Sequence, residues 1–342
     1  MRSPTKVLLS LTVATALLVS ACGGDAAGSG GGDAAGAKLS LVGFSVPKPA
    51  HDAAQKAFAG TDAGKGVTFT SSYGASGDQS RAVASGLDAD VVHFSLEGDV
   101  TRLVDAGLVA DDWNRGPTKG IASSSIVVLV VRKGNPKGIT GWDDLIKDDI
   151  KIVSPNPGSS GSARWNILAA YGHVLADGGT DADAQAYLTK FFQHVAALPG
   201  SGREATTAFS GGTGDVLVSY ENEAILARQN GEDFDYVIPD ETLLIENPAA
   251  VLKTADPAAT AYLDFLESKA GQEIFAAKGF RPVVDGVDVE VKGANDPSNP
   301  FPAPKHLLTI ADDFGGWPAA SKKFFDEDTG IVTKIQQDTG KT

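Results

Sequence analysis

The chain is poor in the residue types that most often carry chemistry or bind nucleic acid. One cysteine among 342 residues excludes an intramolecular disulfide, a two-cysteine redox motif and a cysteine-based zinc site. The five histidines show neither H-x-x-x-H nor H-E-x-x-H spacing, so no metal site is expected. Lys and Arg number only 29 against 43 Asp and Glu, and the formal charge of −14 argues against a nucleic-acid surface.

What remains is the composition of a folded globular protein. Hydrophobic residues make up 42% of the chain and charged residues 21%, which excludes disorder of the whole chain. A chain of this length is expected to form about two domains. After the first 21 residues, no segment is apolar enough to span a bilayer.

The single cysteine, Cys22, follows a leader-like segment. Arg2 and Lys6 precede residues 7–20, which carry no charge, and the segment ends in Val-Ser-Ala-Cys. This order resembles the bacterial lipobox, in which the cysteine becomes an acylated N-terminus. An ordinary signal peptide with an incidental cysteine is the alternative. We expect residues 1–21 to be a signal peptide and Cys22 to carry lipid, which places the protein outside the cytoplasm on a membrane anchor.

Residues 22–37 then form the lipidated cysteine and a flexible linker. Residues 23–37 are almost wholly Gly, Ala, Asp and Ser, a composition that buries no core. Such a segment spans roughly 20 Å on average. It suits a folded body held close to a membrane.

From Lys38 onward, short apolar segments alternate with amphipathic ones, which predicts an α/β protein with a largely parallel sheet. We assign residues 38–125 and 240–342 to one lobe and residues 126–239 to a second. The expected strands are 39–44, 67–70, 89–94, 124–131, 151–153, 214–219 and 236–239; the expected helices are 49–58, 79–86, 99–106, 163–175, 183–196, 223–229 and 258–275, with a last one beyond Pro318.

Three of the strand-to-helix junctions are rich in Ser and Gly. They span residues 73–79, 156–164 and 200–204, and Ser76 with Gln79 and Ser201 with Glu204 match the S-x-x-E/Q capping box. Taken singly, each junction is explained by plain helix capping. Helix starts also attract anions, because their N–H groups are free and the helix dipole is positive there. If the three junctions meet, they form a cage of neutral donors for one small oxyanion.

Such a cage would discriminate between anions. A strongly acidic protein does not attract a dianion from a distance, so binding must come from preorganised short-range hydrogen bonds. Sulfate is fully deprotonated at neutral pH, whereas phosphate still carries a proton. A phosphate O–H buried without an acceptor costs about 1–3 kcal/mol.

Several motifs resemble the sulfate- and thiosulfate-binding proteins of ABC transporters. The resemblance runs from about Leu39 to the C-terminus and is carried by residues 131–136 (VRKGNP), 142–147 (WDDLIK), 155–166 (PNPGSSGSARWN), 214–217 (GDVL) with 221–223 (ENE), and 314–317 (FGGW). It implies a two-lobed periplasmic-binding-protein fold of type II, with two crossing strands between the lobes and the anion in the cleft.

The resemblance also implies a binding site without counter-charge, made of backbone N–H groups, serine hydroxyls and one indole N–H. The anion ligands would be Ser76, through its hydroxyl and N–H, with the Ser160 hydroxyl and the N–H groups of Gly161, Ser162 and Gly202. Tyr220 stands where sulfate-binding members have the tryptophan. Arg164 and Arg203 are expected to brace the site rather than to touch the anion, and Glu221 to cap a helix or hold the backbone nearby.

Three further departures from the family pattern affect the site. Ser162 replaces a glycine but keeps its backbone N–H. Asp78 replaces a basic residue, and its carboxylate would repel an anion if it faced the cleft. Val46 replaces an aspartate. Together with Tyr220, these changes leave the choice between sulfate and thiosulfate open.

Two other functions remain possible from the sequence. The first is a binding protein for another tetrahedral anion, phosphate or molybdate; for phosphate, Asp78 is the candidate proton acceptor. The second is a secreted hydrolase, because Gly74-Ala75-Ser76-Gly77-Asp78 is one glycine short of G-x-S-x-G. We favour a monomeric, lipid-anchored receptor that captures sulfate or thiosulfate and delivers it to an ABC permease, with no cofactor and no covalent chemistry.

Overall fold

The computed structural model describes residues 36–341. The predicted leader and Cys22 lie outside this range. None of the helices between residues 36 and 341 is both long and apolar enough to cross a bilayer. The strands are β1 (Lys38–Phe44), β2 (Thr68–Gly74), β3 (Val91–His93), β4 (Ile121–Arg132), β5 (Ile152–Val153), β6 (Val195–Ala197), β7 (Val216–Tyr220), β8 (Phe234–Val237), β9 (Glu241–Val251) and β10 (His306–Leu308).

The helices alternate with these strands, as the sequence pattern predicts. They are α1 (Lys48–Phe58), α2 (Ser76–Ala84), α3 (Glu97–Asp105), α4 (Gly161–Ala176), α5 (Asp181–His194), α6 (Gly202–Ser210), α7 (Glu221–Gln229), α8 (Pro257–Glu267), α9 (Lys269–Ala276), α10 (Ile310–Phe314), α11 (Trp317–Phe325) and α12 (Ile331–Thr339), with one 3-10 turn, η1 (Trp142–Ile146).

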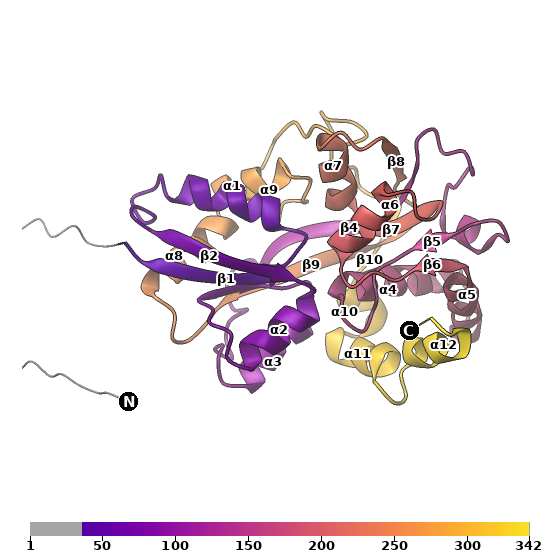
Figure 1. The fold of residues 1–342 in the computed structure, drawn as a ribbon, viewed down its shortest axis with the longest axis horizontal. Coiled ribbons are helices and arrows are strands. Elements are labelled where there is room, and N and C mark those ends of the chain that lie inside the picture. The colour runs from indigo at the N-terminus through magenta and orange to yellow at the C-terminus, as the bar shows by residue number, and fades with distance from the viewer. Residues whose placement is uncertain (1–35, 342) are drawn as a thin grey trace, which may run out of the picture. The chain divides into compact units, whose positions relative to one another are not determined.

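Two long strands connect the two ends of the sheet. The order is β2-β1-β3-β9-β4-β7-β5-β6, with β8 added to β4 and β10 to β9. The first part of β4 pairs with β9, and the part from Val127 to Val131 pairs with β7. Figure 1 shows β4 and β9 running between the group around β1 and β2 and the group around β5 and β6. The outer pairs are parallel, whereas β9 and β4 run antiparallel to their neighbours in this order.

Burial explains why the apolar segments form these elements. Residues 122–131 of β4 are all buried, as expected for a strand covered on both faces. Helix α4 is buried from Gly161 to Trp165 apart from Arg164, and again over most of its middle. Helix α5 begins at a capping box, in which Thr180 Oγ1 accepts from the Asp183 N–H and the Asp183 carboxylate accepts from the Thr180 N–H.

Several expected elements differ from the observed ones. The predicted helix 258–275 is two helices, because Ser268 stops α8 and caps α9, its Oγ accepting from the Gly271 N–H at 3.3 Å. Strand β9 was not among the expected strands; it contains Pro248, a residue type that is uncommon inside sheets. The single helix expected beyond Pro318 is instead α11 followed by α12, and Pro318 lies in the first turn of α11, where its missing N–H costs nothing.

The division into lobes at residues 126 and 240 stays a prediction. The C-terminal helices contact elements of the second proposed lobe: Lys323 Nζ lies 2.9 Å from Asp181 Oδ2 on α5, and the rings of Phe324 and Tyr171 are 4.7 Å apart. Figure 1 shows α12 beside α5. These contacts favour grouping residues after about 306 with 126–239 rather than with 38–125.

Candidate functional site

The three Ser-Gly junctions meet around one small cavity. The space between them is narrow, and its lining also includes the turn that follows β1. The lining residues are Phe44, Ser45, Val46, Gly74, Ala75, Ser76, Ser160, Gly161, Ser162, Ser201 and Gly202. Every one of them is uncharged. Three helices, α2, α4 and α6, begin at this cavity, so their first-turn N–H groups and positive dipole ends converge on it.

The helix starts are capped differently from what the sequence predicts. No side chain caps α2 or α4. Ser76 is the first helical residue of α2 rather than its cap, and the side-chain oxygen Oε1 of Gln79 accepts from the Ser72 hydroxyl instead. At α6 the expected cap is present, because Ser201 Oγ accepts from the Glu204 N–H at 3.2 Å. The first N–H groups of α2 and α4 are therefore not claimed by a capping side chain.

Glycine is required at two positions where separate segments of the chain pack closely together. A Cβ on Gly161 would lie 2.6 Å from Ser95 Oγ, and a Cβ on Gly202 would lie 2.8 Å from Ser162 Oγ. The same added atom on Gly202 would be 3.3 Å from Val46 Cγ2. Only glycine allows such a close approach between backbone and neighbouring side chains.

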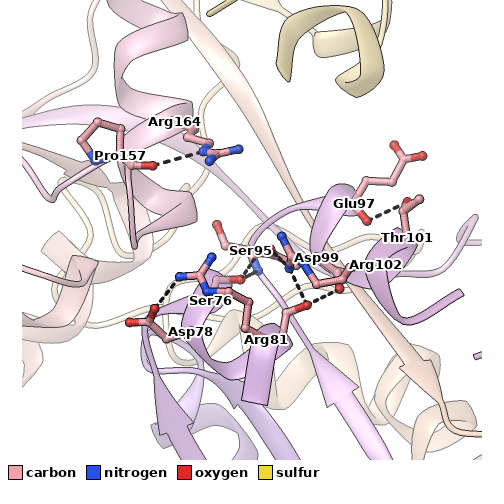
Figure 2. Close-up of polar contacts among 11 residues, drawn as sticks. Ser76, Asp78, Arg81, Ser95, Glu97, Asp99, Thr101, Arg102, Pro157 and Arg164 are labelled. Carbon is pink, nitrogen blue, oxygen red and sulfur yellow. Dashed lines mark hydrogen bonds and ion pairs between the residues drawn. The ribbon is translucent and has the colours of Figure 1, made fainter. Parts of the chain in front are cut away.

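The Ser76 hydroxyl is bound by neighbouring residues and does not serve as the anion donor that the family resemblance implies. It donates to Asp99 Oδ2 at 2.6 Å and accepts from the Ser95 N–H at 2.8 Å. Figure 2 shows this pair of bonds, with Arg102 on the far side of the Asp99 carboxylate. The hydroxyl proton is thus taken by a buried carboxylate, and Ser76 can offer the cavity its backbone N–H. Among residues 36–341, no imidazole bonds to Ser76, so the geometry of a serine nucleophile is not assembled here.

Asp78 does not face the cavity. Its carboxylate pairs with Arg81 Nη2 at 2.5 Å, and 59% of the side chain is exposed. Figure 2 shows this ion pair on α2. The one acceptor that the sequence offered for a phosphate proton therefore lies outside the site, and so does the charge that would repel an anion.

Tyr220 lies behind the cavity rather than in its lining. Its Oη is 2.8 Å from Ser95 Oγ, and the side chain is almost completely buried. Burial raises the pKa of Tyr220 well above its usual range, so the phenol stays neutral. Tyr220 therefore contacts Ser95, whose N–H donates to the Ser76 hydroxyl.

Ser95 is the residue that sequence reasoning missed. Its N–H donates to Ser76, and its carbonyl accepts from Trp165 Nε1 at 2.9 Å and from Asn247 Nδ2 at 3.1 Å. Its hydroxyl meets Tyr220. Each polar atom of this fully buried residue thus joins a different element. The available signal was its place just after the predicted strand 89–94, at the carboxyl end where ligands bind in such sheets.

A buried chain of hydrogen bonds continues from Asn247 to α8. Ser123 Oγ donates to Asn247 Oδ1 at 3.3 Å, so it must accept from His93 Nε2 at 3.2 Å. His93 Nδ1 then accepts from His51 Nε2 at 2.8 Å, and His51 Nδ1 accepts from Tyr262 Oη at 3.0 Å. With this direction of hydrogen-bond donation, every group in the chain of bonds has a partner and both imidazole rings are neutral. Burial lowers the pKa of His93 to about 3, and burial together with His93 lowers that of His51 as well.

Arg203 contacts the cavity wall without entering it. Its guanidinium is paired with Glu223 by two bonds of 2.9 and 2.6 Å, and Nη2 also donates to the Val46 carbonyl at 3.1 Å. Thr206 Oγ1 donates to the same carboxylate at 3.0 Å. The arginine therefore ties the start of α6 to the turn after β1.

Arg164 and Glu221 lie elsewhere. Arg164 Nε donates to the Pro157 carbonyl at 3.2 Å, as Figure 2 shows, and its guanidinium lies over the ring of Phe325. Glu221 is fully buried and paired with Arg281 at 2.7 and 3.1 Å. Burial raises the pKa of Glu221, and the arginine partly offsets this shift. Neither residue lines the cavity.

The fold and the lining define an α/β protein in which three helices begin around one small uncharged cavity. Residues 39–281 match the family model of bacterial extracellular solute-binding proteins. The periplasmic binding protein AfuA from Actinobacillus pleuropneumoniae superposes with a TM-score of 0.64 at 17% identity, covering 90% of this chain and 99% of that one. The predicted class, an α/β periplasmic-binding-protein fold, is confirmed.

Closer relatives specify the family. The chain is 41% identical to a sulfate-binding protein of Synechococcus elongatus (96% and 95% of the two chains covered) and 38% identical to a thiosulfate-binding protein of Pseudomonas aeruginosa (80% and 83%). The structure of the sulfate-binding protein SubI from Mycobacterium tuberculosis matches with a TM-score of 0.79 at 45% identity, over 85% of this chain and 100% of that one. The protein belongs to the sulfate- and thiosulfate-binding proteins of bacterial ABC transporters. This is a family of extracellular solute-binding proteins, not of enzymes, as the resemblance indicated.

Proposed function

We propose that this protein captures sulfate or thiosulfate in the cavity where α2, α4 and α6 begin and delivers it to an ABC permease. The observation that carries the proposal is the lining: it is wholly uncharged and rich in N–H groups at helix starts. A fully deprotonated oxyanion needs donors only, and preorganised donors in a closed site are worth more than in water.

The donors can be assigned residue by residue. The backbone N–H groups of Ser76, Gly161, Ser162 and Gly202 stand at the helix starts. Among the described residues, nothing accepts from the Ser160 hydroxyl, which is therefore free to donate to the anion. The family resemblance implies that the Ser76 hydroxyl contacts the anion. We instead assign it the role of holding Ser95 and Asp99 in place.

The same lining supports rejection of phosphate. Its remaining proton would need an acceptor, and Asp78 is bound to Arg81 at the surface. Burying that O–H unpaired costs about 1–3 kcal/mol. We therefore place sulfate and thiosulfate ahead of phosphate.

Release and capture require the cavity to open. Contacts across it hold the present closed form: the Gly77 N–H donates to the Ser159 carbonyl at 3.3 Å, Trp165 donates to the Ser95 carbonyl, and Arg203 donates to that of Val46. In hinge-type binding proteins such contacts form on closure. We propose that β4 and β9 are the hinge.

We further propose that Cys22 carries lipid and keeps the protein beside its permease. The lipobox-like segment and the Gly-rich linker support this. Labelling of cells with radioactive palmitate should mark the wild type and not Cys22→Ala. Equal labelling of the wild type and Cys22→Ala would contradict the proposed lipid anchor.

Calorimetric titration with sulfate, thiosulfate, phosphate, molybdate and chloride at matched ionic strength tests the ligand. We expect saturable binding of sulfate or thiosulfate, none of phosphate, and at least a fivefold loss in Ser160→Ala. Ser85→Ala, an exposed serine outside the cavity, is the matched control and should bind as the wild type does. Binding of phosphate alone, or of no anion, would overturn the proposal.

A further inference from the structure

A second polar cluster lies where α4 ends. His173, whose side chain is only 7% exposed, points Nδ1 at Glu241 Oε2, 3.2 Å away, and at Asp177 Oδ2, 3.9 Å away. On its other side, Nε2 lies 3.4 Å from Asp143 Oδ1. Three carboxylates from η1, the end of α4 and the start of β9 thus surround one imidazole. None of these residues lines the anion cavity.

The arrangement is incomplete as a set of hydrogen bonds. A neutral imidazole has one N–H, and Asp143 can accept it from Nε2. The lone pair of Nδ1 then faces two carboxylates, so three acceptors point at one another. In the other neutral tautomer Nδ1–H donates to Glu241, and the Nε2 lone pair faces Asp143. In the Nε2–H tautomer, a cation bound to Nδ1, Asp177 and Glu241 would make the meeting of these three acceptors favourable.

We propose that His173 Nδ1, Asp177 and Glu241 form a binding site for a divalent transition-metal ion of the zinc type. The three ligand atoms lie within 4.8 Å of one another. Tetrahedral zinc with ligand bonds of about 2.1 Å separates its ligand atoms by roughly 3.4 Å. The nitrogen and the Glu241 oxygen are already at this spacing, and the exposed Asp177 side chain needs only a small inward shift.

The surroundings of the ring fit a metal-bound histidine. Such a histidine usually donates its other N–H to a carboxylate, which fixes the tautomer; Asp143 occupies that position. The ring also stacks on Trp142 and meets the edge of Tyr187, with centroids 6.4 and 6.0 Å away. The indole N–H of Trp142 donates to the Glu241 carbonyl at 2.8 Å, which ties one ligand residue to the turn that carries Asp143.

The site has an approach from solvent and a defined preference. A cavity of about 350 Å³, lined among others by Asp143, His173, Asp177 and Tyr187, opens beside it and leaves room for water as a further ligand. One nitrogen and two carboxylates suit zinc, cobalt or nickel, whereas magnesium and calcium prefer oxygen ligands alone. His173 lies in α4, Asp177 directly follows it, and Glu241 comes from a strand remote in sequence, which is why histidine spacing did not indicate the site.

Titration of the intact protein with zinc chloride at pH 7.5 tests this inference, with binding measured by calorimetry. We expect one saturable site, at least a tenfold loss of zinc affinity in Asp177→Asn, and a larger loss in His173→Gln. Asp143→Asn should weaken binding about 10- to 100-fold through the ring orientation. Magnesium should not compete.

Asp285→Asn is the matched control for Asp177→Asn, because Asp285 is an exposed aspartate outside the cluster and its loss should leave zinc binding unchanged. Asp177→Asn alters only an exposed side chain, so the test does not depend on the folding of His173→Gln. A cobalt-loaded sample should show a visible absorption band that Asp177→Asn lacks. Absence of saturable zinc binding, or equal affinity in the wild type, Asp177→Asn and His173→Gln, would overturn the site.

Discussion

The two ends of α4 face opposite kinds of site. At its start, Gly161 and Ser162 line a cavity without a charged group, whereas at its end His173 is surrounded by three carboxylates. The helix dipole favours an anion at the first end and a cation at the second. On the two proposals above, one acidic protein serves both kinds of ligand by keeping charge out of the cavity and concentrating carboxylates at the other end of the same helix.

The largest effect is expected from breaking the neutrality of the cavity. In Ser162→Asp a carboxylate would enter a buried site that offers only donors, and we expect sulfate affinity to fall by about a thousandfold or more. Calorimetric titration measures this. Ser85→Asp changes the net charge equally at an exposed position and should bind normally. If Ser162→Asp kept its affinity within tenfold, the cavity would not be the anion site.

The neutral histidine chain behind the cavity gives a pH dependence of stability. The folded pKa of His93 is about 3 and that of His51 is also lowered, mainly by burial, whereas unfolded histidine has a pKa near 6.5. Below pH 6.5 the unfolded chain binds more protons, so stability falls as the pH falls. For His93 alone the loss is about 1.4 kcal/mol per pH unit between about 6.5 and 3.

Urea unfolding between pH 7 and 5 measures this loss. His93→Asn should be less stable at pH 7 but have a flatter pH dependence, whereas the exposed His306→Asn should keep both the stability and the slope of the wild type. A slope that is the same in all three proteins would mean that other groups control the acid sensitivity.

An intermediate effect is expected from Gly161→Ala. The added Cβ would lie 2.6 Å from Ser95 Oγ, and overpacking of this kind costs about 1–3 kcal/mol. The cost falls on the closed form, so sulfate affinity should drop by at least fivefold. Gly98→Ala on α3 meets nothing within 4 Å and should bind as the wild type does. Unchanged affinity in Gly161→Ala would indicate that the bound form is more open than this structure.

A smaller loss is expected where Ser95 meets Tyr220. Either Ser95→Ala or Tyr220→Phe removes the 2.8 Å bond between the two hydroxyls, which is worth about 0.5–1.5 kcal/mol. We expect a two- to tenfold loss of sulfate affinity in each single variant and little further loss in the double variant. Fully additive losses would show that the two hydroxyls act separately.

The sequence was sufficient to predict what depends on local chemistry. Ser and Gly between a strand and a helix indicate a helix start, so the convergence of residues 73–79, 156–164 and 200–204 could be proposed before any coordinates. The sequence did not indicate which groups would be consumed by partners far along the chain. The Ser76 hydroxyl bonds to Asp99, a pairing that residue spacing does not indicate, whereas Asp78 and Arg81 have the i,i+3 spacing of an ion pair on one helix face.

Long-range contacts also explain the elements and residues that were missed. Strand β9 contains a proline, but its place between β3 and β4 overrides that signal. Ser95 matters only because Trp165, Tyr220 and Asn247 reach it from other elements. Glu241 approaches His173 only once β9 is laid against α4. In each case the contact depends on the tertiary fold, and no local sequence pattern indicates it.

The smallest effect is expected for Asp78→Asn, and this variant distinguishes sulfate binding from phosphate binding. Asp78→Asn removes an exposed ion pair worth about 0–1 kcal/mol and should change sulfate affinity less than twofold, because the carboxylate does not reach the cavity. If Asp78 instead accepted a proton from a bound phosphate, the wild type would bind phosphate and this variant would lose it. Parallel titrations of both proteins with sulfate and phosphate distinguish these outcomes. We expect the variant to bind sulfate as the wild type does, and the wild type not to bind phosphate. That result would sharpen the contrast between the uncharged cavity and the carboxylate cluster at the far end of α4.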